Sequence, residues 1–429
     1  MINDAGSPPP LGHLAYLEAL ADAAGAADHG ARWSVVSAGY ATLQLFEVWA
    51  GFHRGALTPD EIEIRRVRRR IESVHDADPI RRCLQQLVEL IERAVLVSGV
   101  DEHRECELAA ARIVAAYGKL LQYEASWSLA RDVFSTLAAF ARLVDDEERL
   151  LDSMLMIGFC HRMLAEFDDA REAYGRLRAL ASQLGSEQYL LLSELGFAKI
   201  AIERGNLPAA VGMLDQLITE TEADEHAAIR AKALMDRARV AAQMGDHTSA
   251  VVLGHEALQC SADPMERERI LINLAMTLRE LGLWDQARDA NVILAATAQE
   301  AAVRWMAQIN LMALATLTHD APMFDAIRRE VSAMPLPPYL RTLLHEASAH
   351  GLRAFGQPAE STLEFRRMLD VAERHGLHEF IVKAREAQRE ASDSANRPAL
   401  AQSTSMGDVT PEVARVARTI TAMRALAGL

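Results

Sequence analysis

A short pattern recurs through the middle of this chain at intervals of 35 to 40 residues, and it limits the folds that the chain can adopt. The pattern is a small residue, any residue, a bulky residue, two further residues and a final alanine or serine. It occurs in five clear and two weaker copies, namely Ala125–Ala130, Ala165–Ala170, Gly205–Ala210, Gly245–Ala250, Gly282–Ala287, Ala321–Ala326 and Gly356–Ser361. Self-similarity with such a period is the signature of repeat proteins, whose units pack in a row against their neighbours.

Each copy is flanked on both sides by about fifteen residues whose apolar positions have helical spacing. We therefore predict a helix, a tight turn and a second, antiparallel helix for each unit. The small residue ends the first helix where a left-handed backbone excludes a large side chain, and the bulky residue fills the gap between the helices. Another small residue precedes each clear turn by seven places and marks the closest crossing of the pair: Gly118, Gly158, Ala198, Ala238 and Ala275.

The turn pattern and its spacing resemble the tetratricopeptide repeat (TPR) family, in a variety with longer helices and a period of about 40 rather than 34 residues. The resemblance covers residues 111–374 and implies about seven repeats. It implies an all-α fold in which antiparallel helix pairs stack into a right-handed superhelical solenoid. The chain departs from the family where the consensus tyrosine of the first helix is replaced by His161, Ala201 or Ala241. The resemblance therefore does not predict the exact residues at which the helices end.

The segments outside the repeats are assigned from local patterns. We expect a disordered tail over 1–10, degenerate repeats or a helical cap over 11–110, a capping helix over 375–391, a flexible linker over 392–409 and an amphipathic helix over 410–429. Within the N-terminal region, residues 60–75 carry one apolar stripe. Asp78 and Pro79 predict a helix start, because aspartate caps helices and proline suits the first helical position.

The charge of the chain argues against a nucleic-acid-binding protein. It has 45 Lys and Arg against 60 Asp and Glu, a net charge of −15, whereas phosphate backbones require an excess of basic groups. The run Arg65–Arg70 is a local exception, but Glu61 is placed to pair with Arg65 and the apolar residues need the opposite face. No segment is a convincing signal peptide or membrane span, and the four cysteines are far apart. We therefore expect a cytoplasmic protein, and the abundance of Arg and Ala over Lys indicates a bacterial source.

The most apolar segment, residues 33–52, predicts a helix that needs covering on most sides. Its aromatic residues form a candidate interface: Trp33, Tyr40, Phe46, Trp49 and Phe52. Such a helix is covered either by neighbouring helices or by a second subunit, so a homo-oligomer is one of the two alternatives.

Motifs that carry catalysis are missing from the sequence. His345 and His350 are five residues apart, so they do not share a helix face as the histidines of zinc proteases do. His375 and His378 can share a face but lack a third ligand. A phosphate-binding loop, a nucleophile elbow and a dinucleotide fingerprint are also absent. We therefore predict a protein that is not an enzyme, with no catalytic residue, metal or cofactor.

The resemblance to TPR proteins implies that the first helix of each pair lines the concave side of the solenoid. Basic residues and one asparagine fall on the inward positions: Arg112, Lys119, Arg162, Lys199, Lys232, Arg239, Arg269, Asn273, Arg279 and Arg353. An acidic protein would then carry a basic concave groove. The helix dipole also favours cations near helix C-termini, which accounts for Arg162, Arg279 and Arg353 without a ligand.

The resulting hypothesis is a non-catalytic scaffold that binds an acidic protein or peptide segment in this groove, with Asn273 holding the peptide backbone. One alternative is a bacterial peptide- or ligand-responsive regulator whose solenoid changes shape on binding, although residues 1–100 show no convincing helix-turn-helix. A further alternative is an enzyme subunit that uses the cavity of the solenoid. The C-terminal helix is expected to dock on the groove of its own chain, to dock on a partner or to stay undocked, and its arginine-rich polar face also fits a membrane surface.

Overall fold

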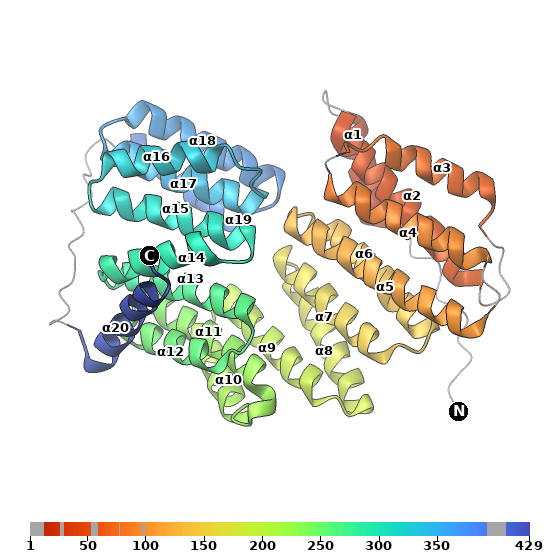
Figure 1. Cartoon of the computed structure of the whole chain (residues 1–429), viewed down its shortest axis with the longest axis horizontal. Helices are drawn as coiled ribbons and strands as arrows, with labels where there is room; N and C mark the ends of the chain where they lie inside the picture. Colours follow the sequence, from red (N-terminus) through yellow and green to blue (C-terminus); the bar gives the residue numbers. More distant parts are fainter. Residues whose placement is uncertain (1–12, 26–29, 53–58, 77, 97–98, 393–408) are drawn as a thin grey trace. The chain divides into compact units, whose positions relative to one another are not determined.

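The computed structural model describes residues 13–25, 30–52, 59–76, 78–96, 99–392 and 409–429 (Figure 1). The regular structure in these ranges is helical, without a strand, so the predicted all-α fold is confirmed. The chain forms two compact units, Met1–Gly196 and Phe197–Leu429, whose boundary falls within the helix α9 (Glu187–Glu203). The predicted tail and all but the two ends of the predicted linker lie outside the described residues.

The first unit contains eight described helices and the start of α9. They are α1 (Leu14–Gly25), α2 (Gly30–Phe52), α3 (Glu61–Glu72), α4 (Pro79–Leu96), α5 (Val100–Tyr123), α6 (Trp127–Leu143), α7 (Glu147–Met163) and α8 (Phe167–Leu184). The second unit contains the rest of α9 and the later helices. They are α10 (Leu207–Glu220), α11 (Ala227–Gln243), α12 (His247–Cys260), α13 (Pro264–Glu280), α14 (Trp284–Thr297), α15 (Ala301–Leu317), α16 (Ala321–Ser332), α17 (Pro338–Ala354), α18 (Pro358–Arg374), α19 (His378–Ser392) and α20 (Pro411–Leu426).

Consecutive helices pack as antiparallel pairs, as the repeat pattern predicts. The pairs are α5 with α6, α7 with α8, α11 with α12, α13 with α14, α15 with α16 and α17 with α18. In the second unit the first helices of adjacent pairs also contact each other, α11 with α13, α13 with α15 and α15 with α17. The first helices therefore form a layer of their own, with the second helices on its other side.

The turns between paired helices adopt the predicted left-handed backbone. At Gly245 the φ angle is 83°, and at Ala165 it is 58°. Asp246 N donates to Ala241 O at 2.9 Å and so closes α11, while the Asp246 side chain accepts from Ser249 N at 3.0 Å and so caps α12. Adjacent residues thus end one helix and begin the next, which forces the two helices to run antiparallel.

The sixth turn differs from the prediction in its register. Its left-handed residue is His319, with φ 57°, rather than Ala321. With this residue, the left-handed positions Gly245, Gly282, His319 and Gly356 follow one another at an equal interval of 37 residues. The composition pattern missed His319 because a histidine replaces the usual small residue, although its backbone does what glycine does elsewhere.

Small residues stand at the helix crossings, as predicted. A Cβ atom added at Gly158 would lie 2.6 Å from Tyr174 Cε1, and one added at Gly118 would lie 2.6 Å from Phe134 Cζ. Such distances are far inside van der Waals contact, so only glycine allows the aromatic ring of the second helix to lie directly on the backbone of the first.

The N-terminal region confirms the predicted helix starts. Asp60 caps α3 through Glu63 N at 2.7 Å, and Glu63 completes a capping box. The Asp78 side chain accepts from Ile80 N at 2.8 Å at the start of α4. In the basic run, Arg65 pairs with Glu61 as predicted, and Arg68 pairs with Glu92 of α4.

The aromatic segment is covered mainly by its own chain. Phe46 and Trp49 of α2 are fully buried, with ring centroids 4.9 and 5.9 Å from that of Phe140 in α6. These two residues are therefore core and not interface, because neighbouring helices bury them. Tyr40 is half-buried and Trp33 is 42% exposed, whereas the Phe52 side chain lies outside the described ones.

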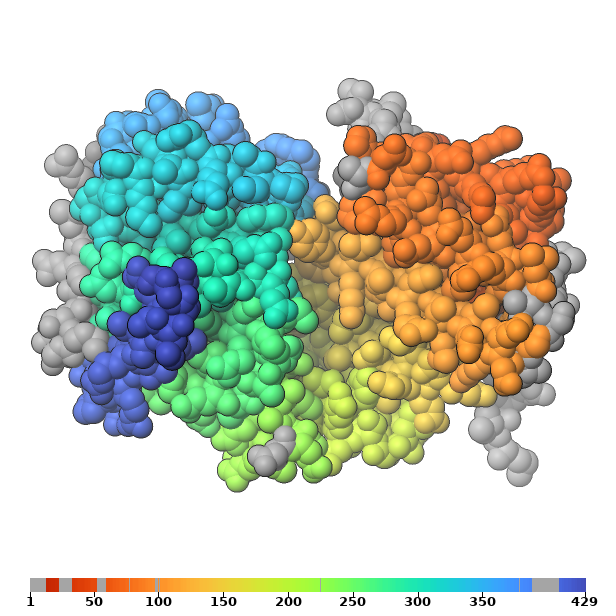
Figure 2. Space-filling model, in the orientation of Figure 1, coloured from red at the N-terminus to blue at the C-terminus, as the bar shows by residue number. Residues whose placement is uncertain are grey.

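The C-terminal helix α20 lies across the second helices α12 and α14 (Figures 1 and 2). Val413, Val416 and Ile420 are buried in the same apolar cluster as residues of these helices. Asp289 of α14 accepts hydrogen bonds from Thr421 Oγ1 at 3.1 Å and from Arg424 Nη1 at 2.6 Å. The helix therefore docks on its own chain, but on the side of the repeats that faces away from the layer of first helices and not in the predicted groove.

Among the described helices, none combines the length and the apolar character needed to cross a lipid bilayer.

Candidate functional site

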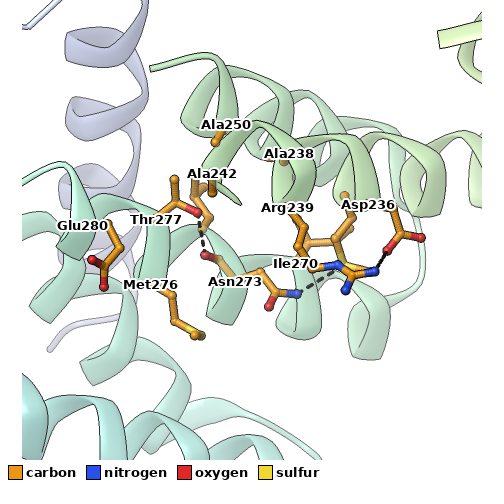
Figure 3. A pocket seen from close by; sticks show the side chains of 13 residues that line it. Asp236, Ala238, Arg239, Ala242, Ala250, Ile270, Asn273, Met276, Thr277 and Glu280 are labelled. Atoms are coloured by element: carbon orange, nitrogen blue, oxygen red, sulfur yellow. Dashed lines mark hydrogen bonds and ion pairs between the residues drawn. The ribbon is translucent and has the colours of Figure 1, made fainter. Parts of the chain in front are cut away.

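A pocket of about 230 Å³ lies between α11, α12 and α13 in the second unit (Figure 3). It opens on the layer of first helices. Its walls are mostly apolar and come from small side chains that leave space between the helices: Ala238 and Ala242 of α11, and Ala250 and Gly254 of α12. The Ile270 and Leu274 side chains of α13 close it.

Polar and flexible side chains of α13 surround the opening. Asn273 Nδ2 donates to Arg269 O at 2.9 Å and lies 3.3 Å from Met235 Sδ. Asn273 Oδ1 accepts no hydrogen bond from any residue that the structure describes, although the side chain is exposed. Met276 is 38% exposed at the same opening. The opening therefore offers a free amide oxygen beside a flexible apolar side chain.

A buried carboxylate joins two of the predicted basic residues at one end of the pocket. Asp236 of α11 is 3% exposed. Its Oδ2 lies 2.8 Å from Lys199 Nζ, and its Oδ1 lies 3.2 Å from Arg239 Nη2. Lys199 and Arg239 alone would carry two positive charges, but together with the Asp236 carboxylate they carry one net positive charge. We refer to Lys199, Asp236 and Arg239 as the ion-paired cluster.

None of the other predicted groove residues of the second unit lines this pocket. Lys232 of α11 is half-buried, and Arg353 of α17 is half-buried in another repeat. Arg279 pairs with Glu280 at 2.7 Å, and Arg269 pairs with Glu300. The structure thus brings together Lys199, Arg239 and Asn273, with Arg269 and Arg279 neutralised next to them.

Three predicted groove residues belong to the first unit. Arg112 is exposed on α5, where its Nε donates to Leu108 O at 3.3 Å. Lys119 is exposed on α5. Arg162 of α7 is largely buried, and its guanidinium carbon lies 5.1 Å from the centroid of the Phe159 ring. A guanidinium that stacks on an aromatic face and is buried there serves packing, so it is poorly placed to bind a solvent-borne ligand.

An aromatic and charged group on α17 and α19 was missed by the sequence analysis. The Tyr339 ring lies 5.4 Å from that of Phe380, and Lys383 Nζ lies 5.2 Å from the Phe380 centroid. Burial raises the pKa of the Tyr339 hydroxyl, as do Glu379 and Glu346, whereas Lys383 and Arg239 oppose the rise.

The sequence did hold a signal for this group. Tyr339, Glu346 and Arg353 follow one another at intervals of seven residues in α17, so they share one face of that helix. Asp236 had a comparable signal, because it lies three residues before Arg239 and four after Lys232 on the same helix. An aspartate among basic residues on a predicted groove indicates an internal ion pair.

One thiol and one cluster of possible metal ligands in the first unit have surroundings that oppose such chemistry. Burial raises the pKa of the Cys160 thiol to about 11, so the reactive thiolate is disfavoured. His161, Glu166 and Asp169 offer ligand atoms within 4.8 Å of one another. However, Glu166 Oε2 already accepts from Arg131 Nη1 at 2.6 Å and lies 2.6 Å from His161 Nδ1. The Arg131 guanidinium thus supplies the positive charge that balances this carboxylate.

Comparison with known families agrees with the repeat pattern. A family model described as tetratrico peptide repeat matches residues 231–349, and one described as tetratricopeptide repeat matches residues 152–182. These two stretches are tetratricopeptide repeats. The TPR stretch 231–349 contains α12, α13 and most of α11, and so all of the described residues that line the pocket. No curated protein matches the sequence.

Solved structures of similar architecture show low sequence identity. The chain is similar to NprR in complex with its cognate peptide NprX, at 13% identity and a TM-score of 0.48, over 78% of this chain and 98% of that chain. It is similar to a Rap protein complexed with competence and sporulation factor, at 12% identity and a TM-score of 0.47, over 80% of this chain and 98% of that chain. The apo form of the quorum sensor NprR from B. thuringiensis is similar at 13% identity and a TM-score of 0.46, over 77% of this chain and 97% of that chain. Similarity at this level does not indicate a ligand for this chain.

Proposed function

We propose that the TPR repeats of the second unit bind a segment of a protein or peptide at the pocket between α11 and α13, without catalysing a reaction. The observation that carries this proposal is the combination of an open apolar pocket, the unpaired Asn273 Oδ1 and the ion-paired cluster on one surface. These groups match three parts of a peptide, namely an apolar side chain, a backbone N–H and an acidic group.

The size of the pocket favours a side chain over a whole small molecule. Its volume of about 230 Å³ is below the roughly 300 Å³ at which pockets for drug-sized ligands begin. The exposed Met276 at the opening adapts to different shapes, as methionine does on peptide-binding surfaces. The pocket therefore suits one apolar anchor residue of a longer segment.

The ion-paired cluster gives the segment an acidic preference. Arg239 is 43% exposed and bonds to Asp236 through a single pair of atoms at 3.2 Å, so several of its N–H groups remain available. An acidic side chain of the segment can therefore bind Arg239 while Lys199 keeps Asp236 neutralised. Asn273 Oδ1 can accept a backbone N–H next to the anchor, since amide oxygens accept two hydrogen bonds.

The test uses peptides selected on the wild-type protein from a phage-displayed random library, with affinity measured by fluorescence anisotropy. Ala242→Phe, which fills the pocket, and Arg239→Gln should each weaken binding by about tenfold or more, a loss of about 1.4 kcal/mol or more. Arg237→Gln is the matched control, because Arg237 lies on the same helix but pairs with Asp215 at 2.8 Å. Thermal unfolding shows that the variants are folded.

The proposal fails if no peptide is retained by the wild type, or if the selected peptides bind Ala242→Phe as tightly as Arg237→Gln. An equal loss in both arginine variants would indicate a general charge effect and would exclude a specific role of Arg239.

A ligand-responsive regulator is a second candidate, and the position of α20 favours it. This helix packs on α12 and α14, the second helices of the two repeats whose first helices line the pocket. A ligand that changes the spacing of α11 and α13 would change the surface under α20. Hydrogen exchange of α20 with and without a selected peptide distinguishes the two: a regulator predicts changed protection, and a plain scaffold predicts none.

A further inference from the structure

A second pocket in the same unit is lined by an unusual excess of arginine. It has a volume of about 210 Å³ and lies between the end of α16, the α17 helix and the α18 helix. Its charged and polar lining includes Arg328, Arg341, His345, Ser348, Glu364 and Arg367. None of these residues lines the pocket between α11 and α13, so the two sites are separate.

The charges of this arginine pocket do not cancel. Three guanidinium groups face a single carboxylate, that of Glu364, in a chain whose net charge is −15. Asp325, one turn earlier in α16, does not line the pocket but lies 3.7 Å from Arg328 and so offsets part of its charge. Bringing three guanidinium groups together costs electrostatic free energy, and a bound anion would offset that cost.

Internal contacts hold the cationic groups in place. Glu364 is buried, and its two oxygens lie 2.6 Å from His345 Nδ1 and 2.6 Å from Arg367 Nη1. Arg341 Nη2 donates to Leu336 O at 2.7 Å. Each of these contacts uses one donor of its side chain, so further N–H groups of Arg341 and Arg367 are available. The donors are therefore oriented before any ligand arrives.

Arg328 supplies an independent observation. Its Nε is buried and has no hydrogen-bond partner in the part of the chain that the structure describes. Arg149 and Arg424 carry a buried Nε of the same kind, and at Arg328 an acceptor in the pocket, such as a bound ion or water, would satisfy the donor. The buried Ser348 hydroxyl provides a further polar group in the same wall.

We propose that this arginine pocket binds a phosphate group, either as inorganic phosphate or as the phosphate of a small monoester. Arginine matches phosphate because its planar guanidinium donates two parallel hydrogen bonds to a pair of oxygens. Three guanidinium groups can serve the several oxygens of one tetrahedral dianion, and the excess of cationic groups in and beside the lining offsets part of its charge. The volume of about 210 Å³ accommodates such a group.

The test measures binding of inorganic phosphate and of glycerol 2-phosphate to the full chain by isothermal titration calorimetry, with sodium chloride at equal ionic strength as reference. The wild type should bind at least one of the two, and Arg328→Gln and Arg341→Gln should each weaken that binding at least about tenfold. The matched controls are Arg329→Gln and Arg366→Gln, since these arginines are exposed neighbours in the sequence that do not line the pocket. Both controls should bind like the wild type.

The two probes separate the possible sources of the ligand. Equal affinity for both identifies the phosphate group alone as the recognised element, and tighter binding of the ester identifies a phosphorylated small molecule. The proposal is overturned if neither probe binds the wild type, if acetate binds with the same dependence on Arg328, or if the control variants lose affinity as much as Arg328→Gln. Far-UV circular dichroism of each variant confirms that it is folded. If one of the two pocket variants is unfolded, its loss of phosphate affinity is not counted. The affinity of the other pocket variant then decides.

Discussion

The Lys199 ammonium lies 2.8 Å from the Asp236 carboxylate, which is buried on the neighbouring first helix and also pairs with Arg239. This contact links α9 to α11 and changes the character of the predicted basic groove. Two of its cations are partly neutralised from within, so the surface at the pocket is only moderately basic.

Replacing Asp236 by Asn should destabilise the fold and make the inner surface more basic. Removing one partner of a buried pair leaves a charge without compensation, which costs about 3–5 kcal/mol when both groups are buried. Because Lys199 is partly exposed, we expect a smaller loss of about 1–3 kcal/mol in the free energy of unfolding, measured by urea denaturation. Asp215→Asn, which breaks the exposed pair with Arg237, should cost less than about 1 kcal/mol. Equal losses in both variants would contradict the importance of burial.

The arginine pocket predicts an acid-dependent contribution to stability. Burial acts to raise the pKa of Glu364, but the hydrogen bonds and charges of His345 and Arg367 outweigh it, and the pKa is lowered. A carboxyl whose folded pKa is lowered stabilises the fold fully above its ordinary pKa, and this contribution is lost as the pH falls through the lowered value.

Glu364→Gln should therefore lower the thermal midpoint at neutral pH and lessen its fall on acidification. Melting curves at a series of pH values from neutral to acidic measure this effect. Glu386→Gln, at an exposed position of α19, should leave the whole profile close to that of the wild type. A parallel shift of the Glu364→Gln profile at all pH values would show that Glu364 acts through packing and not through its charge.

The left-handed turns predict opposite effects of two reciprocal substitutions. A non-glycine residue in this region costs about 1–2 kcal/mol, so Gly245→Ala should reduce the free energy of unfolding by about that amount. A Cβ at Gly245 would meet no atom within 4 Å, so the effect arises from the backbone alone. Ala165→Gly should raise the free energy of unfolding by about 0.5–1 kcal/mol, because the relief of backbone strain in the folded chain exceeds the effect of the entropy gained by the unfolded chain. Denaturant titration of both variants tests this, and a loss in Ala165→Gly would refute it.

The helix crossings predict that glycines of the same repeat differ in their tolerance of a methyl group. Gly158→Ala should cost about 1–3 kcal/mol, since the new Cβ would lie 2.6 Å from Tyr174 Cε1 and the ring must move. Gly175→Ala in α8 should instead stabilise the protein by about 0.5–1 kcal/mol, because it meets no atom within 4 Å and alanine favours helix. Thermal unfolding of the two variants measures the contrast, and a destabilised Gly175→Ala would argue against it.

Local patterns in the sequence were sufficient to predict the repeats. A left-handed turn needs glycine or a small residue, and a close helix crossing needs the same, so Gly158, Gly205 and Gly245 mark both features in the sequence. Caps behave similarly, because Asp60 and Asp78 satisfy backbone groups within three residues of themselves. Interactions of this short range depend on neighbours in the chain and can be read from it.

Residue type alone did not predict the sixth turn or the burial of the aromatic residues of α2, because the same residue type can occur in different structural roles. His319 takes a backbone conformation typical of glycine, so a pattern based on residue size places the sixth turn two residues late. Aromatic residues such as Phe46 and Trp49 occur both in interfaces and in cores. Which of the two applies depends on the helices that pack around them, and the sequence pattern does not give this.

The sequence by itself determined the helices, their turns and their pairing, because these follow from contacts over a few residues. Only the tertiary structure decided which charges are free. Lys199 of α9 and Asp236 of α11 are 37 positions apart and meet only in the folded chain, and Glu364 meets His345 across two helices. Arg328, Arg341 and Arg367 likewise form one pocket because three helices bring them together. The physical reason is that the energy of a charge depends on every group within a few ångströms, and that set is fixed by packing and not by order along the chain.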